Sequence, residues 1–360
     1  MNAANQNFFG VRLKLARKMA GMSLQELSNV LDNFVTKQAL NKYEQGQMKP
    51  SSEVLVLIAK SLKVKPDFFL KKDVPEVRDI SFRKKVSLPK KIEDSIIEKA
   101  RDYVERYFEL ENILGLKRDF KNPIKDLLIN DKSDTENAAK ILRNTWELGN
   151  NAIPKIVEML ELKGIKLMLI DEVDDIDGFS FFTSNFTPVV IVNTRSKSIE
   201  RIRFTIIHEL AHLLLNIDQE LESDKKVIEE LCHHFSSCFL IPSKKLIEMI
   251  GSNKRSYINI KELIAIKEYY GISIRAIVHR LKSIGVITSS YYQRWMIYMS
   301  KTYGQRSEPG NYVGDEKLGV FEQLINRALA EDLISLSKAA SLMNTSINEL
   351  RKGMSYPEIS

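Results

Sequence analysis

The sequence predicts a mostly helical α+β protein with more than one hydrophobic core. Two observations indicate this class: helical spacing of apolar residues dominates most of the chain, and three short apolar, β-branched runs lie between residues 165 and 193. The chain has 360 residues, of which 44% are hydrophobic and 28% charged. This length and composition are typical of ordinary globular proteins with two or three cores.

Membrane and secreted classes are not indicated by the sequence. No apolar run approaches the length of about 18 residues that a membrane span needs, and the N-terminus lacks the basic, apolar and small-residue pattern of a secretion signal. We therefore expect a cytoplasmic protein without a membrane partner. Cys232 and Cys238 are six residues apart in one predicted helix, so they point in different directions and are expected to be reduced thiols.

Positive charge is concentrated at the N-terminus. Residues 1–72 hold twelve Lys and Arg against five Asp and Glu, a net charge of +7, whereas the remaining 288 residues hold 42 of each sign. A small basic domain favours a nucleic-acid partner.

This basic segment has the pattern of several short helices. Ser23 is expected to cap the second helix in a capping box with Glu26, and Thr36 to cap the third, which Gly46 ends. The expected helices span residues 9–19, 24–31, 37–45 and 52–62, with a closing turn from Pro66. A short helix, a turn and a second short helix form a common DNA-reading unit.

Residues 9–70 resemble the Xre-type (Cro/repressor-like) helix-turn-helix family. The resemblance rests on Arg17, Ser23-Leu24-Gln25-Glu26-Leu27, Lys37-Gln38-Ala39, Tyr43-Glu44-Gln45-Gly46 and Lys49-Pro50-Ser51. It implies that Gln25 holds a phosphate, that Lys37, Gln38, Asn41 and Lys42 contact operator DNA, and that Arg17 and Glu44 form a structural ion pair. The alternative is a five-helix module for dimerisation or protein contact.

After this domain the sequence pattern changes from linker to helices and then from helices to strands. Residues 73–90 read as a basic, proline-containing linker, and helical stripes follow at 92–114, at 135–149 and from Pro154 to about Gly164. Short runs of apolar, aromatic or β-branched residues at 165–170, 178–182 and 188–193 then predict a small antiparallel sheet.

An HExxH motif, His208-Glu209-Leu210-Ala211-His212, lies in an apolar helix directly after this sheet. Positions i and i+4 share one helix face, so both imidazoles can bind one metal ion while Glu209 projects toward a water. A half-buried histidine pair needs partners, and Zn²⁺ supplies one. A small sheet before such a helix is typical of zincin peptidases, in which an edge strand pairs with the substrate backbone.

A catalytic zinc ion takes three protein ligands, so one more is required. The next predicted helix, residues 224–240, offers four candidates: Glu229, Glu230, His233 and His234. Glu229 and His233 share one face, and Glu230 and His234 share the neighbouring one.

Residues 165–285 resemble the ImmA/IrrE family of metallopeptidases. The resemblance rests on Gly178-Phe179-Ser180-Phe181, Pro188-Val189-Val190-Ile191-Val192-Asn193, Glu200-Arg201-Ile202-Arg203-Phe204-Thr205, the HExxH motif and Glu229-Glu230-Leu231-Cys232-His233-His234-Phe235. It implies Glu229 as the third zinc ligand. The sequence departs from the family at His233, where Asn or Asp is usual, and at Ser236-Ser237, so His233 and His234 remain second-shell groups or alternative ligands.

The expected domain plan is a helix-turn-helix domain at 1–72, a linker at 73–90, a zincin-like domain at 91–258 with its core at 151–258, and a helical region at 259–360. Residues 329–352 also have helix-turn-helix spacing, for which packing or partner binding is the first interpretation and a second DNA reader the alternative.

Together these features predict a DNA-binding transcriptional regulator with a zinc-dependent endopeptidase domain. Glu209 is the expected general base, and the expected substrate is a repressor or an antitoxin-like protein. Double-stranded operator DNA is the expected nucleic-acid partner, and a homodimer is a further partner hypothesis. One alternative is a toxin or regulator in a toxin–antitoxin or phage-related system, and another is a non-catalytic DNA-binding scaffold with a structural zinc site.

Overall fold

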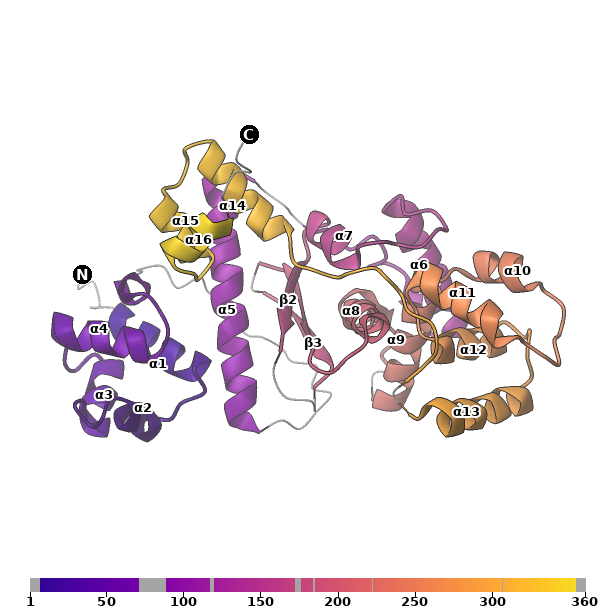
Figure 1. The fold of residues 1–360 in the computed structure, drawn as a ribbon, viewed down its shortest axis with the longest axis horizontal. Helices are drawn as coiled ribbons and strands as arrows, with labels where there is room; N and C mark the ends of the chain where they lie inside the picture. Colours follow the sequence, from indigo (N-terminus) through magenta and orange to yellow (C-terminus); the bar gives the residue numbers. More distant parts are fainter. Residues whose placement is uncertain are drawn as a thin grey trace. The chain divides into compact units, whose positions relative to one another are not determined.

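The computed structural model describes residues 7–70, 89–116, 120–171, 176–183, 185–221, 223–305 and 307–353. Helices dominate, and the strands are short (Figure 1). The predicted mostly helical α+β class is therefore confirmed. Among the described residues, no helix combines the length and apolar character needed to cross a membrane. Residues 73–88 of the predicted linker lie outside the described residues.

The chain divides into two compact units. Of the described residues, those within 7–70, 89–116 and 319–353 form the first unit, and those within 120–318 form the second. This division differs from the predicted domain plan. One helix expected in the zincin-like domain packs on the first N-terminal helix, and three helices of the C-terminal region belong to the same unit.

The N-terminal part of the first unit holds five short helices. These are α1 (Phe8–Met19), α2 (Leu24–Val30), α3 (Lys37–Glu44), α4 (Ser52–Ser61) and the 3₁₀ helix η1 (Pro66–Leu70). The predicted capping box is present, since the Ser23 side chain accepts from the Glu26 amide and Glu26 accepts from the Ser23 amide. Thr36 caps α3 in the same way through the amide of Ala39. These caps satisfy amide groups that a helix leaves open at its start.

A compact apolar core and one ion pair hold these helices together. The core includes Leu13, Leu27, Leu40 and Ile58, none of which is exposed. Arg17 donates from Nε to Glu44 Oε1 at 2.6 Å and from Nη2 to Glu44 Oε2 at 3.0 Å. This bidentate ion pair links α1 to α3, which confirms the structural role expected for Arg17 and Glu44.

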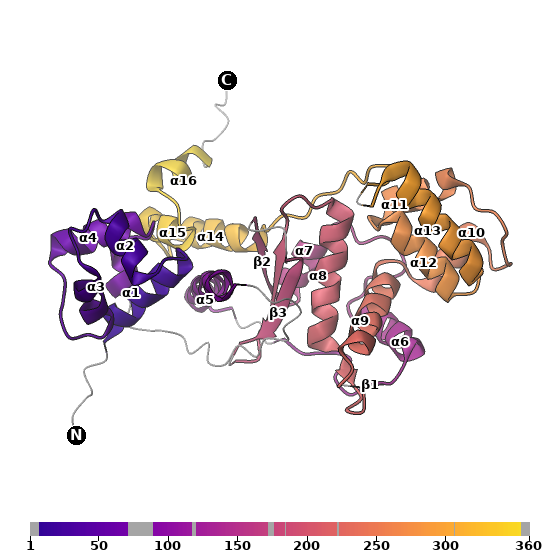
Figure 2. The same cartoon turned by 90° about the horizontal axis from the view of Figure 1, so that it is seen from below.

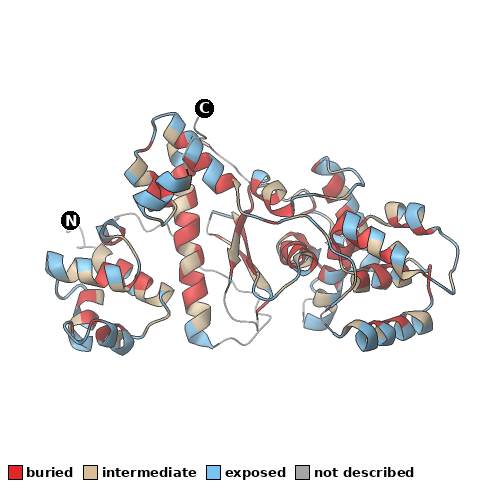
Figure 3. Cartoon of the chain, in the orientation of Figure 1, coloured by how far each residue is buried: buried red, intermediate tan, exposed pale blue. Residues whose placement is uncertain are grey.

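The long helix α5 (Lys90–Ile113) completes the first unit with α14 (Val320–Ala330), α15 (Leu336–Leu342) and α16 (Ile347–Gly353). Arg12 of α1 is fully buried and donates from Nη1 to Glu105 of α5 at 2.7 Å. The Phe321 ring of α14 lies 5.0 Å from that of Tyr107 on α5. Buried residues recur along α5 from Ser95 to Glu111, whereas its first two residues are exposed (Figure 3).

The second unit contains two small sheets and eight helices among its described residues. Its elements are β1 (Leu128–Ile129), α6 (Lys132–Thr145), α7 (Ile156–Leu162), β2 (Lys166–Ile170), β3 (Gly178–Phe182), β4 (Pro188–Asn193), α8 (Ile199–Leu214), β5 (Asn216–Ile217), α9 (Lys225–Leu240), α10 (Ser243–Ile250), α11 (Ile260–Tyr270), α12 (Ile274–Ser283) and α13 (Ser289–Tyr303). The predicted strands and the HExxH helix are all found within a few residues of their expected bounds.

The three-stranded sheet is mixed, so the prediction of an antiparallel sheet was wrong in one pairing. The strand order is β2-β4-β3, in which β3 and β4 are antiparallel and β2 and β4 are parallel. Every residue of β4 is buried, and such a continuously apolar strand belongs at the centre of a sheet. The β3–β4 hairpin occupies one edge of β4, and β2 pairs with the other edge in the parallel direction.

Helix α8 packs against β3 and β4 on one side and against α9 on the other, and α6 packs on α9 (Figure 2). The buried residues of α8 therefore point in several directions, including Ile202, Ile206, Ile207 and Leu210. A helix that is apolar on most sides is expected at the centre of a domain.

An extended segment at residues 304–318 lies across the second unit. The carboxylate of Glu316 accepts from the amides of Ile156 and Val157 at 3.1 and 2.9 Å, at the start of α7, and forms a buried ion pair with Arg203 of α8. Glu308 accepts from the amides of Ile274 and Arg275 at 2.7 and 3.1 Å, at the start of α12. Two buried carboxylates thus fasten this segment to helix N-termini.

Candidate metal centre

Helix α8 places both histidines of the HExxH motif on one face. The helix starts at a Ser198 cap, whose hydroxyl accepts from the Arg201 amide at 3.3 Å, and it continues to Leu214. His208 and His212 are one turn apart, and their Nε2 atoms are separated by 3.1 Å. Regular helix geometry across an apolar segment thus brings the two imidazoles together.

Helix α9 supplies the carboxylate that faces them. Asp224 caps this helix by accepting from the amides of Lys226 and Val227 at 2.9 and 3.3 Å. Glu229 Oε2 lies 3.3 Å from His208 Nε2, and Glu229 Oε1 lies 3.4 Å from His212 Nε2. The structure therefore brings the three predicted ligands together from two helices.

These three residues fit a zinc ion by donor type and by spacing. Two imidazole nitrogens and one carboxylate oxygen form a common zinc ligand set. Ligands bound tetrahedrally at about 2.0–2.1 Å lie roughly 3.3 Å from one another. The observed separations of 3.1, 3.3 and 3.4 Å match this spacing closely.

The Glu209 carboxylate lies against the edge strand β3. Ser180 Oγ is 2.9 Å from the Glu209 carbonyl oxygen and 3.1 Å from Glu209 Oε2. A Cβ at Gly178 would lie 2.7 Å from the Ile191 carbonyl oxygen and 3.2 Å from Glu209 Cγ. Only glycine allows β3 to approach this closely, so the strand and the proposed base are positioned together.

Two partners of the site were not assigned a role from sequence. Ser180 contacts Glu209, and Cys232 Sγ lies 3.4 Å from His212 Nδ1. With Nε2 directed to a metal, Nδ1 carries the proton, so His212 donates to the thiol. Both residues stand within segments that carry the family resemblance, but only the fold shows which side chain each one meets.

His233 lies beside the centre, one turn after Glu229 on α9. Its ring centroid is 4.5 Å from that of His208 and 5.5 Å from that of Phe204. One ring nitrogen each of His233 and His208 and a carboxylate oxygen of Glu229 all lie within 4.8 Å of one another.

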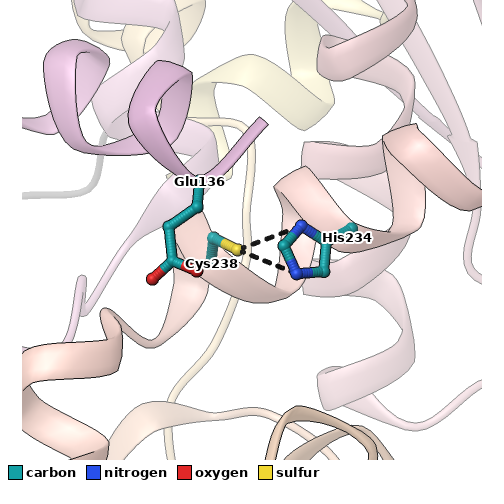
Figure 4. A group of neighbouring side chains, drawn as sticks. All are labelled: Glu136, His234 and Cys238. Carbon is teal, nitrogen blue, oxygen red and sulfur yellow. Dashed lines mark hydrogen bonds between the residues drawn. The ribbon is translucent and has the colours of Figure 1, made fainter. Parts of the chain in front are cut away.

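His234 is directed away from this centre and joins a different group with Glu136 and Cys238 (Figure 4). Its Nδ1 lies 2.7 Å from Thr135 Oγ1, and its Nε2 lies 3.3 Å from Arg280 Nη1. Arg280 can only donate, so Nε2 accepts and Nδ1 donates to Thr135. Its suggested role as an alternative zinc ligand therefore has no geometric support.

The charges around His234 oppose a metal ion there. Burial, followed by the Arg280 charge, lowers the pKa of His234 to about 4. Burial raises the pKa of the Cys238 thiol to about 12, whereas metal binding requires a thiolate. Burial also raises the pKa of Glu136, but hydrogen bonds from Arg280 and Ser243 outweigh it and leave that pKa lowered. This group is a polar contact between α6, α9 and α12.

Three further polar side chains of the second unit have structural partners. Arg203 is fully buried and donates to the carbonyl oxygens of Ile153 and Gly271 at 2.7 and 3.1 Å. Tyr270 donates to the Asn150 carbonyl oxygen at 3.2 Å. Glu230 is exposed and pairs with Lys132 at 3.2 Å.

The residues expected to contact DNA all lie on the surface of α2 and α3. Each of them is exposed: Gln25, Lys37, Gln38, Asn41 and Lys42. Gln25 Nε2 donates to Asn29 Oδ1 at 2.9 Å, which orients the amide along α2. Four of the five stand on α3, which follows α2 after a short turn.

Comparison with known families assigns both regions. Residues 13–69 match the helix-turn-helix family model, and residues 161–282 match the model of the peptidase M78 family, described as the IrrE N-terminal-like domain. A search of curated proteins gave no significant match to the chain. The two resemblances expected from the sequence are therefore confirmed. The chain combines an Xre-type helix-turn-helix domain with a metallopeptidase-like domain of the ImmA/IrrE family.

Proposed function

We propose that this protein is a DNA-binding regulator whose peptidase-like domain is a zinc-dependent endopeptidase acting on a regulatory protein. The observation that carries the proposal is the convergence of His208, His212 and Glu229 at ligand spacing, with Glu209 on the same helix turn. A cytoplasmic location remains a prediction, as does a homodimer.

His208, His212 and Glu229 would hold the metal. When bound there, a zinc ion supplies Lewis acidity, which lowers the pKa of water and polarises a carbonyl group. Glu209 accepts the proton of the attacking water and delivers it to the leaving amine. Ser180 steadies the Glu209 carboxylate through its 3.1 Å contact with Oε2. Cys232 holds His212 in the tautomer that presents Nε2.

Strand β3 offers a place for the substrate backbone. It lies at an edge of the sheet, and its residues Gly178 and Ser180 adjoin Glu209. An extended peptide can add to such an edge through main-chain hydrogen bonds, which select an unfolded or flexible segment of a protein. A repressor or an antitoxin-like protein with an exposed segment is the substrate class we propose.

The N-terminal domain supplies DNA binding. Its net charge of +7 over residues 1–72 matches a polyanionic partner, and α3 presents Lys37, Gln38, Asn41 and Lys42 on its exposed surface. Double-stranded operator DNA is therefore the proposed partner, and cleavage of the regulatory protein would be coupled to transcription.

The Glu209→Gln variant tests the proposed function in cells. We expect wild-type cells to contain protein N-termini, identified by labelling and mass spectrometry, that are missing in the variant although it still binds zinc. Glu230→Gln is the matched control, since Glu230 is exposed and pairs only with Lys132 among the contacts shown above. Identical sets of N-termini in wild type and Glu209→Gln would refute the enzyme proposal.

A further inference from the structure

The His233 ring lies as close to the His208 ring as the ring of His212 does. Its ring centroid is 4.5 Å from that of His208, and the corresponding distance from His208 to His212 is 4.7 Å. A third imidazole therefore lies beside the expected ligands.

Two facing helix stripes hold this imidazole in place. On α8, Phe204, His208 and His212 follow one another at i, i+4 spacing. On α9, Glu229 and His233 have the same spacing. The His233 ring stacks on Phe204 with an interplanar angle of 28° and lies tilted at 47° to the His208 ring. The ring therefore contacts two α8 side chains while His233 keeps an exposed surface.

We propose that His233 is a fourth protein ligand of the metal centre. The inference rests on the proposed function, because it takes His208, His212 and Glu229 as ligands. A ring nitrogen of His233 lies within 4.8 Å of ligand atoms of His208 and Glu229, so a small ring movement completes a set of three nitrogens and one oxygen. Four protein ligands characterise closed zinc sites, whereas three leave a position for water.

The four proposed ligands differ in solvent exposure. The exposed ligand is the one whose place water can take. His208 is buried, with 3% of its surface exposed, while His233 is exposed. His233 is therefore the ligand that can turn toward solvent. Its ring competes with water for the fourth position, so the protein holds zinc more tightly and hydrolyses peptides more slowly than it would with asparagine there.

Metal affinity of the full-length chain tests this proposal without an enzyme assay. In competition with a chromogenic zinc chelator, we expect His233→Asn to bind zinc at least about tenfold more weakly than wild type, by analogy with losses of ligand support at zinc sites. His279→Asn is the matched control, because the His279 ring lies against Tyr292 at 5.7 Å on other elements. Equal zinc affinity of wild type and His233→Asn would overturn the proposal.

A Co²⁺ spectrum reports the coordination directly. With His233 bound, the visible absorption of the Co²⁺ protein should be strong and should change little when acetohydroxamate is added, whereas His233→Asn should respond to this small ligand. The same response in both proteins would contradict a fourth protein ligand. If the spectra differ but neither protein cleaves any substrate, the fourth ligand stands and the peptidase proposal fails. If wild type cleaves a substrate and the two spectra do not differ, the peptidase proposal stands and the fourth-ligand proposal fails.

Discussion

Individual side chains at the centre depend on two different levels of structure. His208 and His212 are brought together by one helix turn, whereas Glu229 reaches them only because α9 packs on α8. The HExxH spacing therefore predicts the pair from local sequence alone. The third ligand came from the family resemblance, since the sequence of α9 offers several acidic and histidine side chains on neighbouring faces.

Removal of one imidazole should release the metal. We expect His208→Ala to lower the zinc content of the purified protein from about one equivalent to close to zero after dialysis, because the remaining donors form an incomplete set. Glu209→Gln should keep its zinc, since Glu209 is no ligand in the proposal. Elemental analysis of the two variants beside wild type measures this. A full equivalent of zinc in His208→Ala would show that the ion is held elsewhere.

His234 should make the stability of the protein depend on pH. Burial and the Arg280 charge lower its folded-state pKa to about 4, below its ordinary value of 6.5. Between pH 4 and pH 6.5, His234 binds a proton in the unfolded chain but stays neutral in the folded chain. Stability is therefore fully present above pH 6.5 and is lost as the pH falls toward 4.

The size of this effect can be measured by urea unfolding with a chelator present. At pH 5 wild type should lose about 2 kcal/mol more of its unfolding free energy, relative to pH 7.5, than His234→Gln loses. The Gln variant keeps a hydrogen-bonding amide but has no titrating ring. Parallel losses in the two proteins would show that His234 is already charged in the folded state.

At the scale of elements, the sequence predicted where strands and helices lie better than how they pair. The all-apolar run of β4 marked a buried strand, yet the mixed order β2-β4-β3 depends on which edge β2 joins, and no local signal encodes that choice. Capping residues such as Ser23 and Thr36 act within one turn, which explains why the helix starts in the N-terminal domain were predicted closely.

The buried Arg203–Glu316 pair should be important for the stability of the second unit. Neither side chain is exposed, so Arg203→Met leaves a buried carboxylate without its cation and should cost about 3–5 kcal/mol in urea unfolding. Arg203→Met with Glu316→Met should recover part of this loss. Arg327→Met is the control, because the Arg327–Glu331 pair is half-exposed and should matter by less than about 1 kcal/mol. A loss in Arg203→Met no larger than in this control would contradict the assignment.

Helix α3 should determine how the protein binds DNA. With duplexes selected from a random pool by the full-length protein, Gln38→Ala should weaken binding by about 1–3 kcal/mol and relax the preference at one base position. Lys42→Ala should weaken binding to all sequences and reduce the salt dependence by about one unit of slope. Fluorescence anisotropy at several salt concentrations measures both effects. Lys60→Ala on the exposed surface of α4 is the control, and an equal effect of all three changes would argue against reading by α3.

At the scale of the whole molecule, the first unit combines segments that are far apart in the chain. Helices α5 and α14 pack together through Tyr107 and Phe321 although more than 200 residues separate them in the sequence. Apolar periodicity showed that each helix has a face to bury, but it carries no information about its partner. The predicted boundaries followed changes in composition along the chain, and for this reason they could not anticipate a unit built from both ends.

The central claim is that the His208, His212 and Glu229 centre holds zinc for peptide hydrolysis with Glu209 as base. Its most direct test is cleavage by the purified full-length protein, loaded with one equivalent of zinc and incubated with a soluble protein extract. New N-termini should form with wild type, and faster with His233→Asn. They should disappear with a chelator, return with added zinc and be missing with Glu209→Gln. The proposal would be contradicted if Glu209→Gln produced the same new N-termini. It would also be contradicted if neither wild type nor His233→Asn produced any.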